Sequence, residues 1–339
     1  MRRWVKAAVT AAAVVGMGGW IAQPYVQDWM LLRSACGGAL PADAVRELAV
    51  DGSHFTGADS ATHERLGSYH CSLTFEGDEV DSDLLLTAEA YTRRDDQDRE
   101  FRSLFEDRGF SPTAALPGGL PGFVDRFGSI RFLVPCPGLG RDDDGRRRRM
   151  LVRTAFGRDA AAGQPAAYET AVALVDAASD RLGCGAEPLR VPKGDDGPPA
   201  PEDDPRTVPF GEADGACARA LGPVLPRPSE WRLADRLGDA APTGRCDLST
   251  GEEDENGGEA PGMTFAVWYG DWSSRLIRYD GVPRTGTATA RCDGETASFA
   301  LSASKDVPGV GRAEQRELLE AFATEQMRRR GCTDLRVTG

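Results

Sequence analysis

Lysine and histidine are scarce in this chain of 339 residues. Both side chains commonly act as bases or activate nucleophiles near neutral pH, so their scarcity weakens Ser-His and Cys-His mechanisms. No histidine occurs in the second half of the chain, where such a mechanism would need other groups. The complete sets are Lys6, Lys193 and Lys305, and His54, His63 and His70.

No motif of a known catalytic type is complete. Ser302-Ala303-Ser304-Lys305 fits the Ser-x-x-Lys pattern, in which a lysine activates a serine. The partner Lys-Thr-Gly motif is absent, however, and the serine falls in a predicted strand instead of opening a helix. No Gly-x-Ser-x-Gly turn occurs either. The sequence therefore predicts no catalytic residue and a protein that is not an enzyme.

A basic surface of the kind that binds nucleic acid is also missing. The formal net charge is −13, and such a surface repels phosphate backbones. The best basic run, residues 146–149, directly follows three aspartates at 142–144 that cancel most of its charge. We interpret this stretch as a hairpin loop and expect no nucleic-acid partner.

Metal-ligating patterns are weak. The three histidines lie in one loop and strand edge, and the second half of the chain has no equivalent, which favours solvated positions over ligands. The acidic stretch 252–257 resembles the start of a calcium loop, but its first position is Glu252 and its twelfth is Met263 instead of glutamate. We predict a solvated acidic loop there, with weak calcium binding left open, and no metal site or cofactor.

The N-terminus carries a long uncharged segment. The 21 residues from Ala7 to Gln27 have no charge, and as a helix they would rise about 31 Å, close to the roughly 30 Å hydrocarbon core of a bilayer. Positive charges at residues 2, 3 and 6 precede the segment, and Asp28 follows it. The positive-inside rule then predicts a cytoplasmic tail at 1–6, a transmembrane signal anchor at 7–27, a juxtamembrane segment at 28–35 and an extracytoplasmic remainder.

Two alternatives compete with the anchor. A cleaved signal peptide needs small residues at its cleavage site, whereas the region around Trp20, Ile21 and Gln23 carries large ones. A lipoprotein signal would use the stretch 32–36, which has Arg33 where an apolar residue is required. The anchor is the preferred interpretation, and cleavage of the segment stays open.

Eight cysteines are widely spaced, without any Cys-x-x-Cys pair, and form two sets of four. An even number in an exported chain predicts disulfides instead of zinc or redox sites. The sequence around each cysteine of the first set parallels that around its counterpart, as the steps Gly183-Cys184 and Gly331-Cys332 illustrate. Four cysteines allow three pairings, and the parallel contexts favour pairing of neighbours. The predicted bridges are Cys36 with Cys71, Cys136 with Cys184, Cys217 with Cys246, and Cys292 with Cys332.

The cysteine parallel predicts two copies of one α+β module, at residues 36–191 and 212–339. In each copy strand-like runs surround the third cysteine and a helix ends at the Gly-Cys step. A Leu-Arg-Val segment follows as a final short strand, at 189–191 and 335–337. The expected fold class is two tandem small antiparallel sheets with packed helices, preceded by one transmembrane helix.

The two predicted copies differ in their connections. Residues 192–211 are rich in proline and acidic residues, which predicts a stiff linker that holds the copies apart. The first copy is also longer, with an inserted helix around 99–108 and a loop of glycine and proline at 117–122.

Aromatic residues gather in the second copy. Along the predicted strand 263–269, alternation places Trp268 on the face opposite Phe265 and Val267, so burial of those two turns Trp268 outward. Trp272 follows a turn and would lie beside it, which gives a stacking surface for sugar rings or peptide side chains. Core packing is the competing interpretation. The predicted ligand site consists of Trp231, Trp268, Tyr269 and Trp272.

With its cysteine pairs, Gly-Cys helix ends and N-terminal segment, the chain resembles small extracytoplasmic proteins of high-GC Gram-positive cell envelopes, including lipoprotein-like and kinase-sensor ectodomains. The resemblance covers nearly all of the chain after the apolar segment, and it implies location and fold more than activity. The chain departs from it in its duplication, its missing lipobox and the absence of a kinase domain.

Three functions are consistent with these observations. A membrane-anchored binding or sensing protein of the envelope, with a cell-wall or protein ligand, comes first, because two linked modules raise effective concentration at a ligand. An envelope structural or assembly protein is the second expectation. An extracytoplasmic hydrolase is the third, since neither copy shows a nucleophile with a base.

Overall fold

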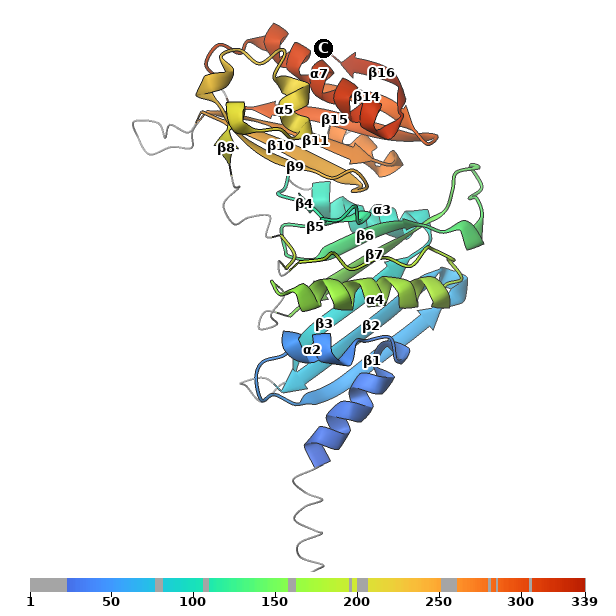
Figure 1. Ribbon diagram of the computed structural model, residues 1–339. Helices are drawn as coiled ribbons and strands as arrows, with labels where there is room; N and C mark the ends of the chain where they lie inside the picture. Colours follow the sequence, from blue (N-terminus) through green and yellow to red (C-terminus); the bar gives the residue numbers. More distant parts are fainter. Residues whose placement is uncertain are drawn as a thin grey trace, which may run out of the picture.

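A computed structural model describes residues 23–76, 82–105, 110–157, 163–194, 197–199, 207–250, 261–279, 282–284, 286–304 and 307–338. It contains two antiparallel sheets of seven strands each, with helices packed on them, and one two-stranded ribbon. Figure 1 shows an N-terminal helix, sheet 1 and then sheet 2 following one another along the molecule. The fold is α+β with two sheet copies, as the sequence predicts.

Sheet 1 has the strand order β1-β2-β3-β7-β6-β5-β4, and all neighbouring strands are antiparallel. Its strands are β1 (Phe55–His63), β2 (Ser68–Glu76), β3 (Ser82–Tyr91), β4 (Ala114–Ala115), β5 (Gly122–Val124), β6 (Ile130–Pro135) and β7 (Arg149–Phe156). Its helices are α2 (Ala42–Leu48), α3 (Arg94–Arg102) and α4 (Pro165–Arg181), with 3-10 turns η1 (Ala35–Gly37), η2 (Glu64–Leu66), η3 (Ser103–Phe105) and η4 (Pro137–Leu139).

Sheet 2 has the order β16-β14-β15-β11-β10-β9-β8, again antiparallel throughout. Its strands are β8 (Val208–Pro209), β9 (Arg232–Leu237), β10 (Thr243–Ser249), β11 (Gly262–Tyr269), β14 (Thr287–Cys292), β15 (Glu295–Ala303) and β16 (Thr333–Thr338). The ribbon is β12 (Arg278–Tyr279) with β13 (Val282–Pro283). The helices are α5 (Ala216–Leu221), α6 (Ser274–Ile277) and α7 (Arg312–Arg330), with 3-10 turns η5 (Phe210–Glu212), η6 (Pro228–Glu230) and η7 (Asp271–Ser273).

Five strands follow the same order in both sheets. β1-β2-β3-β7-β6 in sheet 1 corresponds to β9-β10-β11-β15-β14 in sheet 2, with the second cysteine of each set on β2 or β10. The edge beyond β6 or β14 is extended differently in the two copies. In sheet 1 the inserted strands β5 and β4 occupy it, whereas in sheet 2 the C-terminal strand β16 does.

This difference corrects one strand prediction. Residues 335–337 lie in β16 and pair with β14, as expected, but residues 189–191 form no strand. The hydrogen-bonding edge of β6 is already taken by β5, through the pairs Gly122 with Phe132 and Phe123 with Arg131. A sheet can gain a further strand only at an edge whose backbone N–H and C=O groups are unpaired. Because β5 already pairs with this edge of β6, the segment after α4 lies elsewhere.

Each sheet packs one face on its own helices. In sheet 1, α4 lies against β7 and β3, and α2 packs against α4; alternate residues of β6 and β7, such as Phe132 and Val152, belong to the core that these helices share with the sheet. In sheet 2, α5 and α7 cover Phe265, Val267 and Phe299. Alternation along each strand leaves the other set of side chains on the opposite face. The predicted alternation in β11 is therefore confirmed.

The opposite faces of the two sheets meet in a third apolar cluster, the interface cluster. Sheet 1 and its inserted helix α3 supply Phe101, Leu104, Phe105, Phe123, Leu133 and Leu151, and sheet 2 supplies Ala266, Trp268, Trp272, Leu276 and Ala300. The two modules are therefore packed together, and the expectation that a linker holds them apart is wrong. The predicted linker also contains an element of sheet 2, because β8 pairs with β9.

All four predicted disulfides are present: Cys36–Cys71, Cys136–Cys184, Cys217–Cys246 and Cys292–Cys332. Each joins the first helical segment to the second strand of its copy, or the end of the closing helix to the strand that carries the third cysteine. Such bridges indicate an oxidising, extracytoplasmic compartment.

The described part of the chain begins with a helix at residues 23–34. Most of the predicted span at 7–27 lies outside the described residues. Within them, no helix combines the length and apolar character that a bilayer crossing requires.

Candidate binding site beside the Cys136–Cys184 disulfide

The segment that follows α4 borders a cavity of about 630 Å³ in module 1. This volume falls within the range of typical small-molecule sites. Its walls come from the insert, from the end of β6 and from the displaced segment after Cys184. The lining residues are Pro121, Val134, Pro135, Cys136, Pro137, Gly140, Arg141, Arg147, Arg148, Ala186, Glu187 and Leu189.

Hydrogen bonds from backbone N–H groups hold the segment after Cys184 in place. The Ala186 N–H donates to the Ser179 hydroxyl oxygen at 3.0 Å, and the Leu189 N–H donates to the Asp176 carboxylate at 3.3 Å. On the other side, the Gly138 N–H donates to the Cys184 carbonyl at 2.8 Å. The cavity wall is thus tied both to α4 and to the disulfide.

The rim of the cavity is a short hairpin, which we call the arginine hairpin, at residues 140–148. The Asp142 N–H donates to the Arg146 carbonyl at 2.9 Å, and the Arg148 N–H donates to the Gly140 carbonyl at 3.1 Å. The Asp142 carboxylate also accepts the Asp144 and Arg146 N–H groups, which closes the turn. The hairpin predicted for this charged stretch is confirmed.

The arginines of this hairpin and the adjoining Arg149 divide into two groups. Arg146 pairs with Asp142, Asp144 and, across the module interface, Asp271, while Arg149 lies 4.0 Å from Glu295. Among the described ion pairs none involves the three cavity arginines at positions 141, 147 and 148. The aspartates therefore cancel the charge that faces module 2 and leave the charge that faces the cavity.

Arg94 completes the charged contact between the modules. It lies 3.1 Å from Glu295, 3.4 Å from Asp142 and 3.7 Å from Asp271. Burial raises the pKa of Asp142, but hydrogen bonds from Arg146 lower it by more. The pKa of this carboxyl group is therefore below its usual value. The pKa of Asp271 is lowered overall in the same way, where burial is outweighed by hydrogen bonds from the Thr296 N–H and Arg146.

The cavity combines apolar walls with a one-sided positive charge. Prolines, Val134 and Leu189 offer apolar contact, and guanidinium groups form paired hydrogen bonds with carboxylate, sulfonate or phosphate oxygens. Glu187 is the one acidic residue of the lining. An anionic ligand with an apolar portion is the chemistry that this arrangement can bind.

The predicted aromatic ligand site is not an exposed surface. Trp231, Trp268, Tyr269 and Trp272 are all buried, with Trp268 only 1% and Trp272 only 3% exposed. Phe101 stacks on Trp272 at 4.4 Å between ring centroids, and Phe105 and Phe123 contact Trp268 at 4.8 and 5.8 Å. The stacking-site prediction is therefore wrong, because the insert of module 1 covers the face that β11 turns outward.

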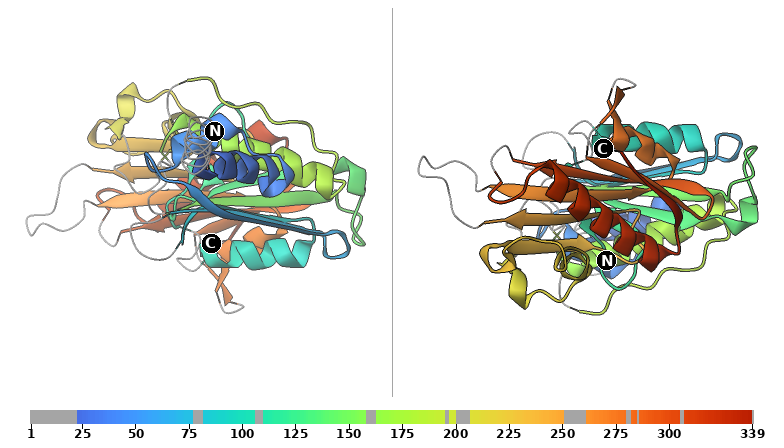
Figure 2. Two further views of the ribbon diagram at one scale, coloured as in Figure 1. Left: turned by 90° about the horizontal axis from the view of Figure 1, so that it is seen from below. Right: turned by 90° about the horizontal axis from the view of Figure 1, so that it is seen from above.

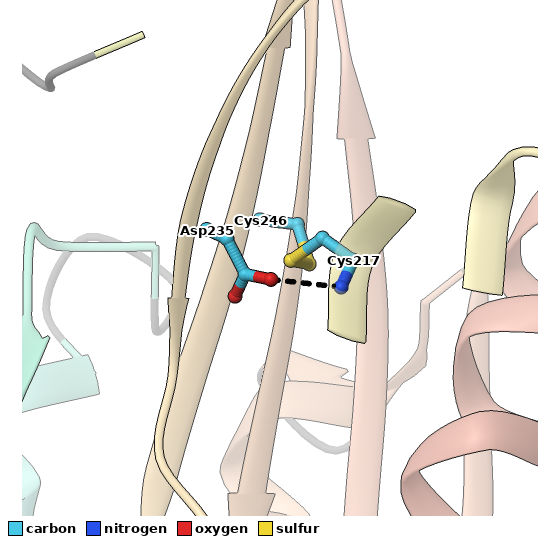
Figure 3. A group of neighbouring side chains, drawn as sticks. All are labelled: Cys217, Asp235 and Cys246. Carbon is cyan, nitrogen blue, oxygen red and sulfur yellow. Dashed lines mark hydrogen bonds between the residues drawn. A yellow bond between two sulfur atoms is a disulfide. The ribbon is translucent and has the colours of Figure 1, made fainter. Parts of the chain in front are cut away.

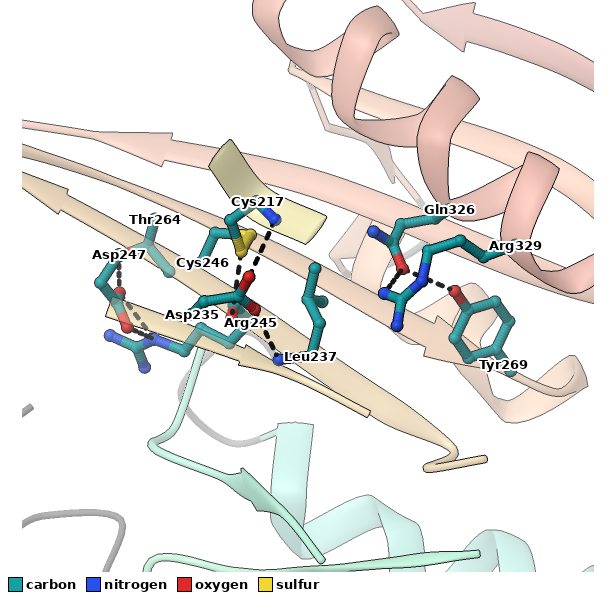
Figure 4. Close-up of a disulfide and its surroundings, with 10 residues drawn as sticks. All are labelled: Cys217, Asp235, Leu237, Arg245, Cys246, Asp247, Thr264, Tyr269, Gln326 and Arg329. Atoms are coloured by element: carbon teal, nitrogen blue, oxygen red, sulfur yellow. Dashed lines mark hydrogen bonds and ion pairs between the residues drawn. A yellow bond between two sulfur atoms is a disulfide. The ribbon is translucent and has the colours of Figure 1, made fainter. Parts of the chain in front are cut away.

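Trp231 and Tyr269 lie on the other side of sheet 2, in its helix-covered core. The Trp231 indole N–H donates to the Pro226 carbonyl at 3.1 Å. The Tyr269 hydroxyl donates to the Gln326 side-chain oxygen at 3.3 Å (Figure 4). The Arg330 guanidinium lies 4.3 Å from the centre of the Tyr269 ring. Core packing, the competing interpretation, describes all four residues.

Two sulfurs and a carboxylate lie together at Cys217, Asp235 and Cys246 (Figure 3). The sulfurs are bonded to each other, so they are not available as thiolate ligands. The Asp235 carboxylate instead accepts the N–H groups of Cys217 at 2.9 Å and Leu237 at 3.1 Å (Figure 4). It satisfies an otherwise unpaired donor at the start of α5, and this cluster is structural.

The three histidines do not converge. His54 pairs through Nδ1 with Asp28 at 2.8 Å, whereas His63 and His70 lie on β1 and β2. Ser302 and Ser304 lie in β15 and directly after it, and Lys305 is outside the described residues, as is the acidic loop 252–257. No catalytic constellation is present in the described ranges.

Burial of the Tyr269 hydroxyl makes the stability of the protein depend on pH in the alkaline range. Burial raises the pKa of this hydroxyl to about 12 in the folded chain, against about 10 in the unfolded chain. The unfolded state therefore loses its proton first, and stability is full below pH 10 and falls between pH 10 and 12. We expect wild type to lose roughly 2 to 3 kcal/mol more than Tyr269→Phe over this interval, measured by urea unfolding. Parallel curves for the two proteins would contradict this.

Comparison with protein-family models, curated proteins and solved structures gives no match for this chain. The site therefore has to be judged on its own geometry. Sequence reasoning missed the cavity because it treated residues 142–149 as self-neutralising. The sequence does contain one indication of the site. Four consecutive arginines follow only three aspartates, so the aspartates cannot neutralise every arginine of the stretch.

Proposed function

We propose that this protein is a membrane-anchored, extracytoplasmic binding protein of the cell envelope, and that its ligand is an anion with an apolar portion. The cavity beside the Cys136–Cys184 disulfide is the observation that carries the proposal. Three guanidinium groups without a described carboxylate partner border it, in a chain whose formal net charge is −13. Positive charge concentrated at one site of an acidic protein is expected to serve local recognition.

The surrounding structure supports binding over catalysis. The four disulfides and the interface cluster hold the cavity walls on a rigid frame, and rigid frames reduce the entropy cost of binding. Neither a nucleophile with a base nor an acid–base pair lines the cavity. The bound anion would meet Arg141, Arg147 and Arg148, with its apolar portion on the prolines and Leu189.

A pair of dyes tests this site. Anilinonaphthalene sulfonate carries an anionic group and aromatic rings, whereas phenylnaphthylamine carries the rings without the charge. We expect the sulfonate dye to bind wild type saturably and the neutral dye to bind more weakly. The double variant Arg147→Gln/Arg148→Gln should lose at least about tenfold in sulfonate-dye affinity, since hydrogen bonds to charged groups contribute roughly 1.5–3 kcal/mol each. Dye fluorescence titration gives both affinities.

The matched control is Arg312→Gln/Arg316→Gln, which removes the same charge from exposed positions on α7. It should leave both affinities within about twofold of wild type, apart from long-range screening effects. Equal loss in the two double variants would show that net charge alone governs dye binding and would overturn the proposed site. Thermal unfolding of each variant establishes that the compared proteins are folded.

A second candidate function, a structural protein of the envelope, draws support from the interface cluster. Two modules joined by eleven buried apolar residues form one elongated unit. A spacer between the membrane and a more distant layer needs this rigidity. If the folded wild-type protein binds neither dye, this second candidate is favoured.

A further inference from the structure

The helix at residues 23–34 carries an unusual exposed face. Four large side chains on it are exposed: Tyr25 is 66% exposed, Val26 49%, Trp29 49% and Met30 54%. Tyr25 lies at the border of this face, where its ring also packs edge-on against the His54 ring at 5.3 Å between centroids. With Arg33 these four residues form one stripe on the helix. At 3.6 residues per turn, positions 25, 26, 29, 30 and 33 all lie within a sector of about 140° around the helix axis. We call this set the apolar stripe.

The adjoining face of the same helix is fixed to module 1. Leu32 is buried in the core of sheet 1, and Asp28 is buried beside the start of β1. One Asp28 oxygen accepts the Phe55 N–H at 2.8 Å and the other contacts His54 Nδ1 at 2.8 Å. The helix therefore cannot roll to bury its stripe without breaking these contacts.

Other surface helices of this chain show what a solvent-facing side looks like. The exposed positions of α7 are mostly charged, among them Glu314, Arg316, Glu317, Glu320 and Arg328. A helix that faces water normally follows this pattern. A cluster of four exposed large apolar residues within six positions marks a surface that meets another apolar phase.

We infer that the apolar stripe lies in the outer headgroup region of a lipid bilayer and seats module 1 on the membrane surface. This inference rests on the proposed membrane anchor, because the stripe crosses the end of the uncharged run at Gln27: Tyr25 and Val26 lie inside the run, and Trp29 and Met30 lie beyond it. A helix rises about 1.5 Å per residue, so Trp29 and Met30 would lie about 3–5 Å beyond a span ending there. The headgroup region of one leaflet is about 5–7 Å thick, which accommodates both residues.

The composition of the stripe fits this location. Tyrosine and tryptophan favour the membrane interface, where an apolar ring meets water and polar headgroups. The Arg33 guanidinium lies 4.3 Å from the centre of the Trp29 ring, and there it would reach lipid phosphates. Module 2 lies at the opposite end of the molecule from this helix (Figure 1). Figure 2, viewed from below, shows the N-terminal helix at the near end, where a membrane would lie.

Spin labels on the full chain in lipid vesicles test the inference. Val26→Cys and Met30→Cys place a nitroxide on the stripe, and Glu320→Cys places one on the charged face of α7. At positions 26 and 30 we expect collisions with the membrane-soluble relaxant oxygen to be severalfold more frequent than those with a water-soluble nickel complex. The label at position 320 should show the reverse order.

Each outcome separates the stripe from the anchor. If alkaline washing releases the chain from the vesicles, the anchor fails and the inference fails with it. If the chain stays bound but label 30, which lies beyond the proposed span, collides as freely with nickel as label 320, the anchor stands and the stripe inference is overturned. Protection from both relaxants, with spin–spin broadening that dilution by unlabelled protein removes, would show that a second copy covers the stripe and would also overturn the inference.

Discussion

Replacement of Phe101 by alanine is expected to lower the free energy of unfolding by about 3–5 kcal/mol, the usual cost of removing a buried phenylalanine. Phe101 is fully buried, stacks on Trp272 and meets Trp268 edge-on at 6.3 Å. Its loss should admit water to both indoles, so tryptophan emission should shift to longer wavelength. The mutation lies in module 1 and the reporters lie in module 2, so the shift measures their contact directly.

Phe132→Ala is the matched control for this experiment. Phe132 is equally buried, but it packs under the helices of sheet 1 and takes no part in the interface cluster. It should destabilise the protein by a similar amount and leave the emission of the folded protein unchanged. A Phe101→Ala protein that keeps wild-type emission would contradict the described packing of the modules.

Arg131→Met is expected to cost about 3–5 kcal/mol, because it leaves a buried carboxylate without its cation. The Arg131 Nε donates to Asp125 at 2.8 Å, and its Nη1 donates to Glu100 on α3 at 3.3 Å. Asp125 is fully buried and also accepts the N–H groups of Phe127 and Ser129. Urea unfolding at neutral pH measures the loss.

Arg153→Met serves as its control. Arg153 lies directly opposite Arg131 in the β6–β7 pair, but it is partly exposed and pairs with Glu89 at 3.5 Å. Partly exposed ion pairs contribute little, so this change should cost less than about 1 kcal/mol. Similar losses in the two variants would refute the special role of the buried Asp125–Arg131 pair.

The local pattern of the sequence was sufficient to predict much of the fold. β6 lies directly before the third cysteine, Cys136, where the sequence predicts a strand-like run, and the two closing helices end within two residues of the predicted Gly-Cys steps. The disulfide pairing followed from the same repeat. These features depend on short-range signals, namely alternation, glycine caps and cysteine context.

The errors arose where tertiary contacts decide. Alternation correctly placed Trp268 opposite Phe265, but no local signal says that an insert more than a hundred residues earlier covers that face. The strand at 189–191 failed for a similar reason, because β5 had filled the edge that it would use. For residues 84–91 the sequence predicts simple alternation, with Leu84 and Leu86 on the same face. In β3 a bulge instead buries both Leu85 and Leu86 and leaves Leu84 exposed.

The candidate site could not be predicted from either copy alone. The site exists because the equivalent sheet edges, at β6 and β14, are covered differently. In module 2 the C-terminal strand β16 pairs with β14, whereas in module 1 the inserted strand β5 pairs with β6. The segment after Cys184, which forms no strand in module 1, lines the cavity instead. Comparison of the copies within one sequence reveals the length difference but not its consequence.

The contact between the modules uses the same face of both copies, the side of each sheet turned away from its closing helix. The pairing is not reciprocal, because the insert strand β4 of module 1 contacts β9 and β10 of module 2. Each of the two faces is nevertheless covered by the other module. A third copy could not join through the same face, so this contact cannot generate a filament, and any larger assembly would have to grow through the sheet edges or the helical surfaces.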